Sequence, residues 1–167
     1  MVFQKIKDIL GGEIKLIISG GAPLSKEVKD FFMVVFCVPV EEVYGVTECA
    51  GGVAATSVWD RSTGNVGGPS CVVKIKLRDL PELGYMTTDE PYPRGEVCIK
   101  GHSVFKGYFR NKDLTSEVFD KDGWLHLGDV GMILPNGAVQ LIDRVKSIAK
   151  LQTGIYVAPQ CLENIYS

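Results

Sequence analysis

The stretch IKLIISGGAPLS, residues 14–25, decides how the first part of this chain folds. A short β-branched segment at 14–18 runs directly into a glycine pair, which is typical of a buried strand that ends in a turn. Ser25 then offers its side-chain oxygen as the N-cap of a helix, because it can accept a hydrogen bond from a free N–H group of the first turn. The stretch therefore predicts a strand, a turn and a helix in immediate succession.

The residues on both sides extend this alternation of helices and strands. Upstream, apolar residues at 2–10 recur at helical spacing before a second glycine pair. Downstream, the helix that starts at Ser25 ends before Pro39, and residues 40–44 form a second predicted strand. The expected inner face of that helix carries Val28, Phe31, Phe32 and Val35. Residues 1–65 are thus expected to be part of an N-terminal α/β subdomain.

Beyond this first part the chain becomes mainly a β sequence. Residues 61–70 are rich in Gly, Ser, Asn and Pro and are expected to form a loop. One helix is expected at 111–119. Strands are predicted at 73–77, 96–100, 130–134 and 138–142, where the last two flank a Pro-Asn-Gly turn and make a hairpin. We expect residues 66–142 to form a β-barrel-like subdomain, so the fold class is α/β followed by a mainly antiparallel β unit.

The final segment, residues 143–167, starts with a basic run and ends with apolar spacing that predicts the first turns of a helix at 161–166. We expect a hinge followed by the start of a C-terminal domain that is cut short. The chain is therefore expected to be an internal fragment of a larger protein.

Composition excludes several classes of function. Hydrophobic residues make up 46% and charged residues 23%, as in an ordinary folded domain, and the net charge of -2 does not favour nucleic acid or an anionic membrane surface. The most apolar stretch, residues 31–40, is about half the length of a transmembrane helix, so no membrane anchor is expected in this segment. The five cysteines lack zinc-like C-x-x-C spacing and indicate reduced thiols in an intracellular protein.

Four clusters offer groups suited to nucleotide chemistry. Residues 19–25 hold glycines that allow a flat ligand to approach the backbone. Residues 44–48, Tyr-Gly-Val-Thr-Glu, combine an aromatic face, a hydroxyl and a carboxylate, which can stack a base, bond a phosphate and hold a hard cation. Asp129 ends the run DGWLHLGD, where a carboxylate beside glycine suits two vicinal hydroxyls. The basic run 143–150 provides Arg144 and Lys150 for phosphate.

Three of these clusters, taken singly, have a structural explanation as well. These are a plain glycine turn, a surface turn with a buried tyrosine, and a solvated basic strand. His126 alternates with two leucines and is expected to face solvent or a polar neighbour. The chain contains no P-loop, G-x-G-x-x-G, H-E-x-x-H or G-x-S-x-G motif, which argues against those nucleotide-binding and hydrolytic sites.

In this order, the stretches SGGAPLS, YGVTE, DGWLHLGD and DRVKSIAK resemble core motifs of the adenylate-forming superfamily of acyl-CoA synthetases, luciferases and related ligases. Three further stretches, LPELGYMTTDEPYPRGEVCIKG, VFKGYFRNKDLT and KLQTGIYVAPQCLENIY, narrow the resemblance to the long-chain fatty acyl-CoA synthetases. The resemblance implies part of a fold with two α/β sheets and a β-barrel, followed by a small mobile C-terminal domain.

The resemblance also implies a reaction in two steps. A long-chain fatty acid attacks the α-phosphate of Mg-ATP to give an acyl-adenylate and pyrophosphate, and coenzyme A then displaces AMP. The implied ligands are therefore ATP or AMP, Mg²⁺, coenzyme A and the fatty acid. The full-length protein would be intracellular, in the cytoplasm or on the cytosolic face of an organelle membrane. Oligomeric state is not implied.

Roles follow residue by residue from the matching motifs. The nucleotide and acyl pocket would be lined by Gly20, Gly21, Ala22, Tyr44 and Gly45, with Asp129 and Arg144 on the ribose. Thr47 would contact the α-phosphate and Glu48 would hold Mg²⁺. Lys146 falls at the hinge, and Lys150 falls where the family carries an active-site lysine that depends on domain rotation.

Several positions depart from the family pattern. The family usually has glycine at Val43, often glutamine at Glu42, threonine at Leu127 and commonly glutamate at Gln160. The valine is expected to crowd the pocket, and the leucine removes a hydroxyl. The family's phosphate loop and its adenylation lysine fall outside the chain, so we expect the chain alone to be inactive. Two alternatives remain, a remnant that only binds nucleotide or a partner, and a sister ligase for another carboxylate.

Overall fold

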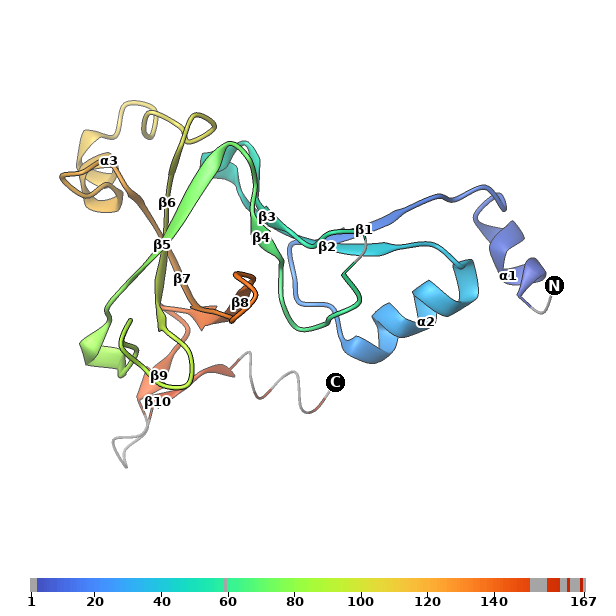
Figure 1. Ribbon diagram of the computed structural model, residues 1–167. Helices are drawn as coiled ribbons and strands as arrows, with labels where there is room; N and C mark the ends of the chain where they lie inside the picture. The colour runs from blue at the N-terminus through green and yellow to red at the C-terminus, as the bar shows by residue number, and fades with distance from the viewer. Residues whose placement is uncertain (1–2, 59, 151–155, 160–161, 163–165, 167) are drawn as a thin grey trace.

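Two four-stranded sheets make up most of the molecule (Figure 1). The computed structural model describes residues 3–58, 60–150, 156–159, 162 and 166. The first sheet, with the helices α1 and α2, occupies one end of the molecule, and the second sheet, with α3, occupies the other (Figure 1). No helix within those ranges is long and apolar enough to cross a membrane.

The first sheet begins with two parallel strands that are connected by a helix. Strand β1 (Ile17–Gly20) pairs in parallel with β2 (Val40–Val46), and α2 (Lys26–Phe36) connects them. Ser25 caps α2 as expected, because its Oγ accepts a hydrogen bond from the backbone N–H of Val28 at 3.4 Å. The helix α1 (Gln4–Ile9) precedes β1.

Two short strands complete this sheet. Strand β3 (Gly51–Ala55) pairs antiparallel with β2, and β4 (Gly68–Pro69) pairs antiparallel with β3. Between β2 and β3 the 3₁₀ helix η1 (Thr47–Cys49) turns the chain. The predicted α/β character of the first part is confirmed, with an antiparallel edge that the residue pattern did not indicate.

The expected packing of β1 and α2 is wrong in two respects. Strand β1 begins at residue 17 instead of 14, and its Ile18 is 59% exposed where a buried strand was expected. On α2, Val28 and Phe31 are exposed, whereas Lys29 is fully buried. Lys29 is buried because its ammonium group forms an ion pair with Glu42 of β2. The side of α2 that carries Lys29 therefore faces the sheet.

The second sheet is antiparallel throughout and follows chain order. It consists of β5 (Val73–Arg78), β6 (Arg94–Gly101), β7 (Leu125–Ile133) and β8 (Val139–Arg144). Helix α3 (Lys112–Val118) lies between β6 and β7 in sequence, and η2 (Pro81–Leu83) follows β5. The predicted hairpin is confirmed at 134–138, where the Leu134 N–H donates to the Ala138 carbonyl at 2.9 Å.

A bulge interrupts the pairing of β6 with β7. Glu96 pairs with Val130, but Cys98 pairs with His126. Val97 on β6 therefore faces residues 127–129 of β7, which bow out of the ladder. This irregularity places Asp129 at the junction of the two sheets.

One hydrophobic core connects the sheets. Its buried members come from both of them, namely Tyr44, Cys49, Val53, Ala54, Val73, Val97, Ile99 and Leu125. Beyond β8 the short strands β9 (Ala149–Lys150) and β10 (Tyr156–Val157) pair antiparallel. Residues 161 and 163–165 of the helix expected at 161–166 lie outside the described residues.

Candidate functional site

A cleft of about 470 Å³ lies where the first and second sheets meet. Its wall is formed by the turn after β1, the end of β2, the loop at 63–66, and the facing parts of β7 and β8. Six of the residues predicted from the sequence line it, namely Gly21, Ala22, Tyr44, Gly45, Asp129 and Arg144. Segments that are distant in sequence therefore contribute to one concave site, which is typical of a small-molecule site.

Tyr44 and Asp129 form the polar centre of the cleft. The Tyr44 hydroxyl donates a hydrogen bond to Oδ2 of Asp129, and the two residues are only 8% and 7% exposed. Burial raises the pKa of Tyr44, so the phenol keeps its proton and remains a donor. Burial also raises the pKa of Asp129, while the hydrogen bond from Tyr44 and the charge of Arg144 act in the opposite direction.

Arg144 reaches the other oxygen of the same carboxylate. Its Nε lies 3.3 Å from Oδ1 of Asp129, because the two residues are paired across β7 and β8. The Arg144 side chain is 76% exposed and so can move, whereas Asp129 is held. The arrangement gives one fixed carboxylate with one oxygen hydrogen-bonded to Tyr44 and the other beside an exposed guanidinium, and a carboxylate with two oxygens suits a ligand with neighbouring hydroxyl groups.

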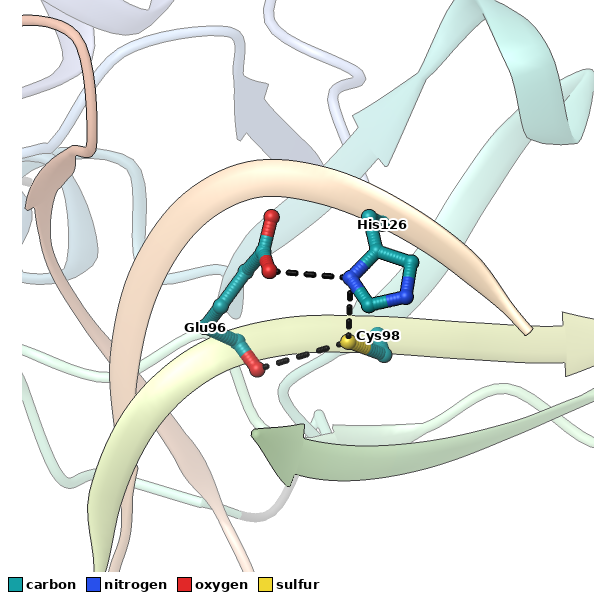
Figure 2. Close-up of side chains that lie close together, drawn as sticks. All are labelled: Glu96, Cys98 and His126. Carbon is teal, nitrogen blue, oxygen red and sulfur yellow. Dashed lines mark hydrogen bonds and ion pairs between the residues drawn. The ribbon is translucent and has the colours of Figure 1, made fainter. Parts of the chain in front are cut away.

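Glu96 on β6 forms a hydrogen bond with the backbone of the bulge that carries Asp129. Figure 2 shows Glu96, Cys98 and His126 gathered at this point. Oε1 of Glu96 accepts a hydrogen bond from the Gly128 N–H at 3.1 Å, and Oε2 lies 2.9 Å from Nδ1 of His126. Arg78 brings its Nη2 to 2.6 Å from the same Oε2. His126 thus has the polar neighbour that the sequence predicted.

These three side chains could also be considered as metal ligands. A carboxylate oxygen, the Cys98 sulfur and an imidazole nitrogen all lie within 4.8 Å of one another. The Arg78 guanidinium already contacts Oε2, and burial raises the pKa of the Cys98 thiol to about 12, which keeps it protonated. Both features favour a hydrogen-bond network over a metal centre.

Thr47 and Glu48 lie just beyond the cleft wall, on η1. Oε1 of Glu48 accepts a hydrogen bond from the Tyr108 hydroxyl at 2.7 Å, and that bond is the main cause of a raised Tyr108 pKa. The Glu48 carbonyl accepts the Phe105 N–H at 2.7 Å. Thr47 is exposed. Together they present a hydroxyl and a carboxylate, the hard oxygen ligands that Mg²⁺ prefers.

Tyr108 was not assigned a role from the sequence. It belongs to the stretch VFKGYFRNKDLT, which carried the family resemblance, and it reaches Glu48 only through the fold, across 60 residues. No local signal in its own neighbourhood indicates this contact.

A buried ion pair fixes one side of the cleft and was also missed. Nζ of Lys29 lies 3.0 Å from Oε1 of Glu42 and donates to the Ser62 carbonyl at 2.8 Å. Ser62 in turn accepts from the Asn65 side chain at 2.7 Å. Lys29 therefore anchors the cleft loop at 63–66 to β2. The Glu42 carboxylate therefore has a buried charge partner.

Two glycines are required by the close approach of neighbouring strands. A Cβ on Gly20 would lie 2.6 Å from Cγ2 of Val43, its partner across β1 and β2. A Cβ on Gly45 would lie 1.9 Å from the Gly51 carbonyl oxygen. Gly20 does not itself line the cleft; it makes room for Val43, which does. Val43 therefore lies where it can crowd a ligand in the cleft, as expected from the sequence.

Leu127 and Lys146 are not among the described residues that line the cleft. Leu127 packs against the hydrophobic core. Lys146 is exposed in the turn after β8, and Lys150 is in β9, with its side chain outside the described part of the structure.

Comparison with known proteins identifies the family of the chain. Residues 2–109 match the model of the AMP-binding enzyme family. Long chain acyl-CoA synthetase 7, peroxisomal, of Arabidopsis thaliana is 46% identical over 167 residues, which are 100% of this chain and 24% of that protein. Long-chain-fatty-acid–CoA ligase 5 of Mus musculus is 47% identical over 167 residues, with the same two coverages.

A solved structure has the same fold. The A domain of carboxylic acid reductase from Segniliparus rugosus, in complex with AMP and a co-purified carboxylic acid, superposes with a TM-score of 0.82 at 39% identity. The match covers 99% of this chain and 25% of that one. The chain thus spans about a quarter of the length of the relatives it matches. On the family match and the identity to these relatives, the chain belongs to the AMP-binding enzyme family.

Proposed function

We propose that the protein carrying this chain is a fatty-acid–CoA ligase. It activates a long-chain fatty acid with Mg-ATP to an acyl-adenylate, releases pyrophosphate, and transfers the acyl group to coenzyme A with release of AMP. The observation that carries the proposal is the convergence of Tyr44, Asp129 and Arg144 on one cleft. The names of the Arabidopsis and mouse relatives support the fatty acid as substrate.

Within this proposal, the cleft holds the adenosine part of the nucleotide. The Asp129 carboxylate accepts the ribose hydroxyls, and Arg144 swings aside or shares one oxygen. Gly21, Ala22 and Gly45 leave the backbone open to the flat base beside Tyr44. The burial of the Tyr44–Asp129 pair excludes water and strengthens these hydrogen bonds.

The phosphates are assigned to the adjoining η1. Thr47 meets the α-phosphate and Glu48 holds Mg²⁺, with Tyr108 orienting the carboxylate. When bound, the metal offsets the negative charge that develops as pyrophosphate leaves. Lys146 is assigned to the hinge and Lys150 to the second, thioester-forming arrangement, in which coenzyme A is the acceptor. We place the protein inside the cell, in the cytoplasm or on the cytosolic face of an organelle membrane.

The test uses the protein at its full natural length. Palmitate, ATP, Mg²⁺ and coenzyme A should give AMP and pyrophosphate in equal amounts. Asp129→Asn should weaken AMP binding by about 10-fold to 100-fold, the worth of one or two hydrogen bonds to a charged group. Asp122→Asn, on an exposed turn two residues before Trp124, should change nothing. A protein that releases no AMP with any fatty acid would contradict the proposal.

The position of Val43 favours one alternative. Val43 lines the cleft, and the family resemblance leads us to expect glycine at this position. A protein that has lost the reaction would still bind nucleotide through Asp129 and Arg144. Micromolar AMP binding by the full-length protein without turnover would establish that alternative, and turnover would exclude it.

A further inference from the structure

The bulge in β7 is an unusual place for a ligand-binding carboxylate. Residues 127–129 lie opposite the single residue Val97, so their backbone groups have lost their ladder partners on β6. A buried N–H group without an acceptor is costly, and such groups are normally satisfied by other means. In this bulge the Gly128 N–H donates to Oε1 of Glu96. The Gly128 carbonyl accepts the Val145 N–H at 2.8 Å.

Gly128 also takes a backbone conformation that disfavours other residues. Its φ of 70° lies in the left-handed region, where only glycine is unstrained. The direction in which Asp129 leaves the bulge is therefore set by Gly128. What holds Gly128 in place thus also determines where the Asp129 carboxylate points.

Glu96 is itself held rigidly. The residue is 4% exposed, and its second oxygen contacts both Arg78, its partner across β5 and β6, and His126 (Figure 2). A buried carboxylate is tolerated when each oxygen has a good donor, and here both oxygens do. The network therefore runs from the solvent-exposed edge at Arg78, through Glu96, to the backbone of the bulge.

We propose that Glu96 is a positioning residue that holds the Gly128–Asp129 bulge so that Asp129 can bind the ribose hydroxyls of the nucleotide. It touches neither nucleotide nor acyl group, and acts through the Gly128 N–H alone. The inference rests on the proposed function, because it takes Asp129 as the ribose ligand. It adds a buried residue of β6, outside the cleft wall, to the determinants of nucleotide affinity.

The informative substitution is Glu96→Gln. Glutamine keeps the shape but replaces one oxygen by an NH₂ group, which is a donor. The NH₂ group then faces another donor, either the Gly128 N–H or the Arg78 guanidinium. The bulge must shift to relieve this, and the Asp129 carboxylate shifts with it. Glu82→Gln, exposed on η2, is the matched control.

The experiment compares two nucleotides by calorimetry on the full-length protein. AMP presents both ribose hydroxyls, whereas 2′,3′-dideoxy-AMP presents neither. Wild-type protein is expected to bind AMP about 10-fold to 100-fold more tightly than the dideoxy analogue. Glu96→Gln should reduce this ratio to within about 3-fold while leaving the affinity for the dideoxy analogue unchanged. A purely structural role would lower both affinities together and leave the ratio intact.

The outcomes separate the inference from the function on which it rests. A wild-type ratio that persists in Glu96→Gln overturns the positioning role and leaves the function standing. A wild-type protein that does not distinguish the two nucleotides overturns the ribose role of Asp129, and the inference falls with it. If Glu96→Gln fails to fold, Arg78→Gln replaces it, since the Arg78 side chain is half exposed. That variant should lower the ratio about 2-fold to 5-fold, and an unchanged ratio there overturns the inference.

Discussion

The Tyr44 hydroxyl donates a hydrogen bond to the Asp129 carboxylate, joining the end of β2 to the bulge of β7 across 85 residues of sequence. Each residue alone is poorly suited to burial. A buried phenol needs an acceptor and a buried carboxylate needs a donor, and each supplies what the other lacks. The bond therefore ties the α/β sheet to the antiparallel sheet at the centre of the cleft.

Asp129 should make stability depend on pH in a defined direction. Because its pKa is raised in the folded protein, mainly by burial, the folded state binds this proton more tightly than the unfolded chain does. The stability that the site contributes is fully present below the unfolded pKa of about 3.9, and is lost as pH rises through the folded value. At neutral pH the ionised carboxylate therefore lowers stability.

Asp129→Asn is accordingly expected to raise the melting temperature at pH 7, although it weakens nucleotide binding. The loss of attraction to Arg144 counts for little, since that side chain is largely exposed. The advantage over wild type should shrink as pH falls toward 4, where wild-type Asp129 takes up its proton. Thermal melts of both proteins from pH 4 to 8 test this. An advantage that stays constant with pH would show that Asp129 is not the titrating group.

The buried pair of Lys29 and Glu42 predicts a large effect on stability. Lys29→Met leaves the Glu42 carboxylate buried with no cation beside it, and removes the donor to the Ser62 carbonyl. We expect a loss of about 3–5 kcal/mol in the free energy of unfolding, which is the usual cost of breaking a buried pair. Denaturant unfolding measures it.

Lys26→Met on the same helix is the matched control. Lys26 pairs with Asp30 on the exposed side of α2, and exposed pairs of this kind contribute little. The double variant Lys29→Met, Glu42→Leu should recover much of the loss, because neither charge is then left unpaired. If Lys26→Met and Lys29→Met were equally stable, the ion pair would have no structural role.

The contrast between Lys26 and Lys29 shows where the sequence stops being informative. The Ser25 cap and the Pro135-Asn136-Gly137 turn are local signals, and both predictions are confirmed because their physics acts over a few neighbouring residues. Lysine on a helix is solvated by default. Only the fold brings Glu42 and the Ser62 carbonyl to Lys29, so its burial has no signature in the residues beside it.

The site follows the same division. Six of the residues that line the cleft were predicted, because they belong to contiguous motifs between the turn after β1 and Arg144. The residues that hold these side chains in place were not predicted. The bulge under Asp129 depends on the register between β6 and β7, and Glu96 and Tyr108 act across 32 and 60 residues. Alternating patterns predict which strands exist, but they do not specify such a slip in pairing.

Tyr108 should influence the metal requirement of the reaction. Tyr108→Phe removes the hydroxyl that holds Oε1 of Glu48. Groups that orient a metal ligand are typically worth about 10-fold to 100-fold in metal affinity. We expect the Mg²⁺ concentration for half-maximal AMP release to rise by about 10-fold, with little change in stability. Tyr92→Phe provides the control. An unchanged Mg²⁺ dependence would argue against Glu48 as the metal ligand or against Tyr108 as its support.

The contact between Gly20 and Val43 offers a test of the cleft wall that does not depend on the reaction. Gly20→Ala places a methyl group against Cγ2 of Val43 and close to its carbonyl oxygen, so overpacking should cost about 1–3 kcal/mol. In a Val43→Gly background the side-chain part of this clash disappears, and the same substitution should cost less. Val43→Gly alone should lower stability by about 1 kcal/mol, because glycine weakens a strand.

Val43→Gly should at the same time strengthen nucleotide binding, since it removes a side chain from a residue that lines the cleft. A loss of stability combined with a gain in AMP affinity is the expected signature, measured by melting and by calorimetry on the same preparations. Val40→Gly, a buried position on the same strand outside the cleft wall, should lower stability without that gain. If Val43→Gly leaves AMP affinity unchanged, valine at this position does not crowd the nucleotide, and the crowding must be sought in the path of the acyl chain.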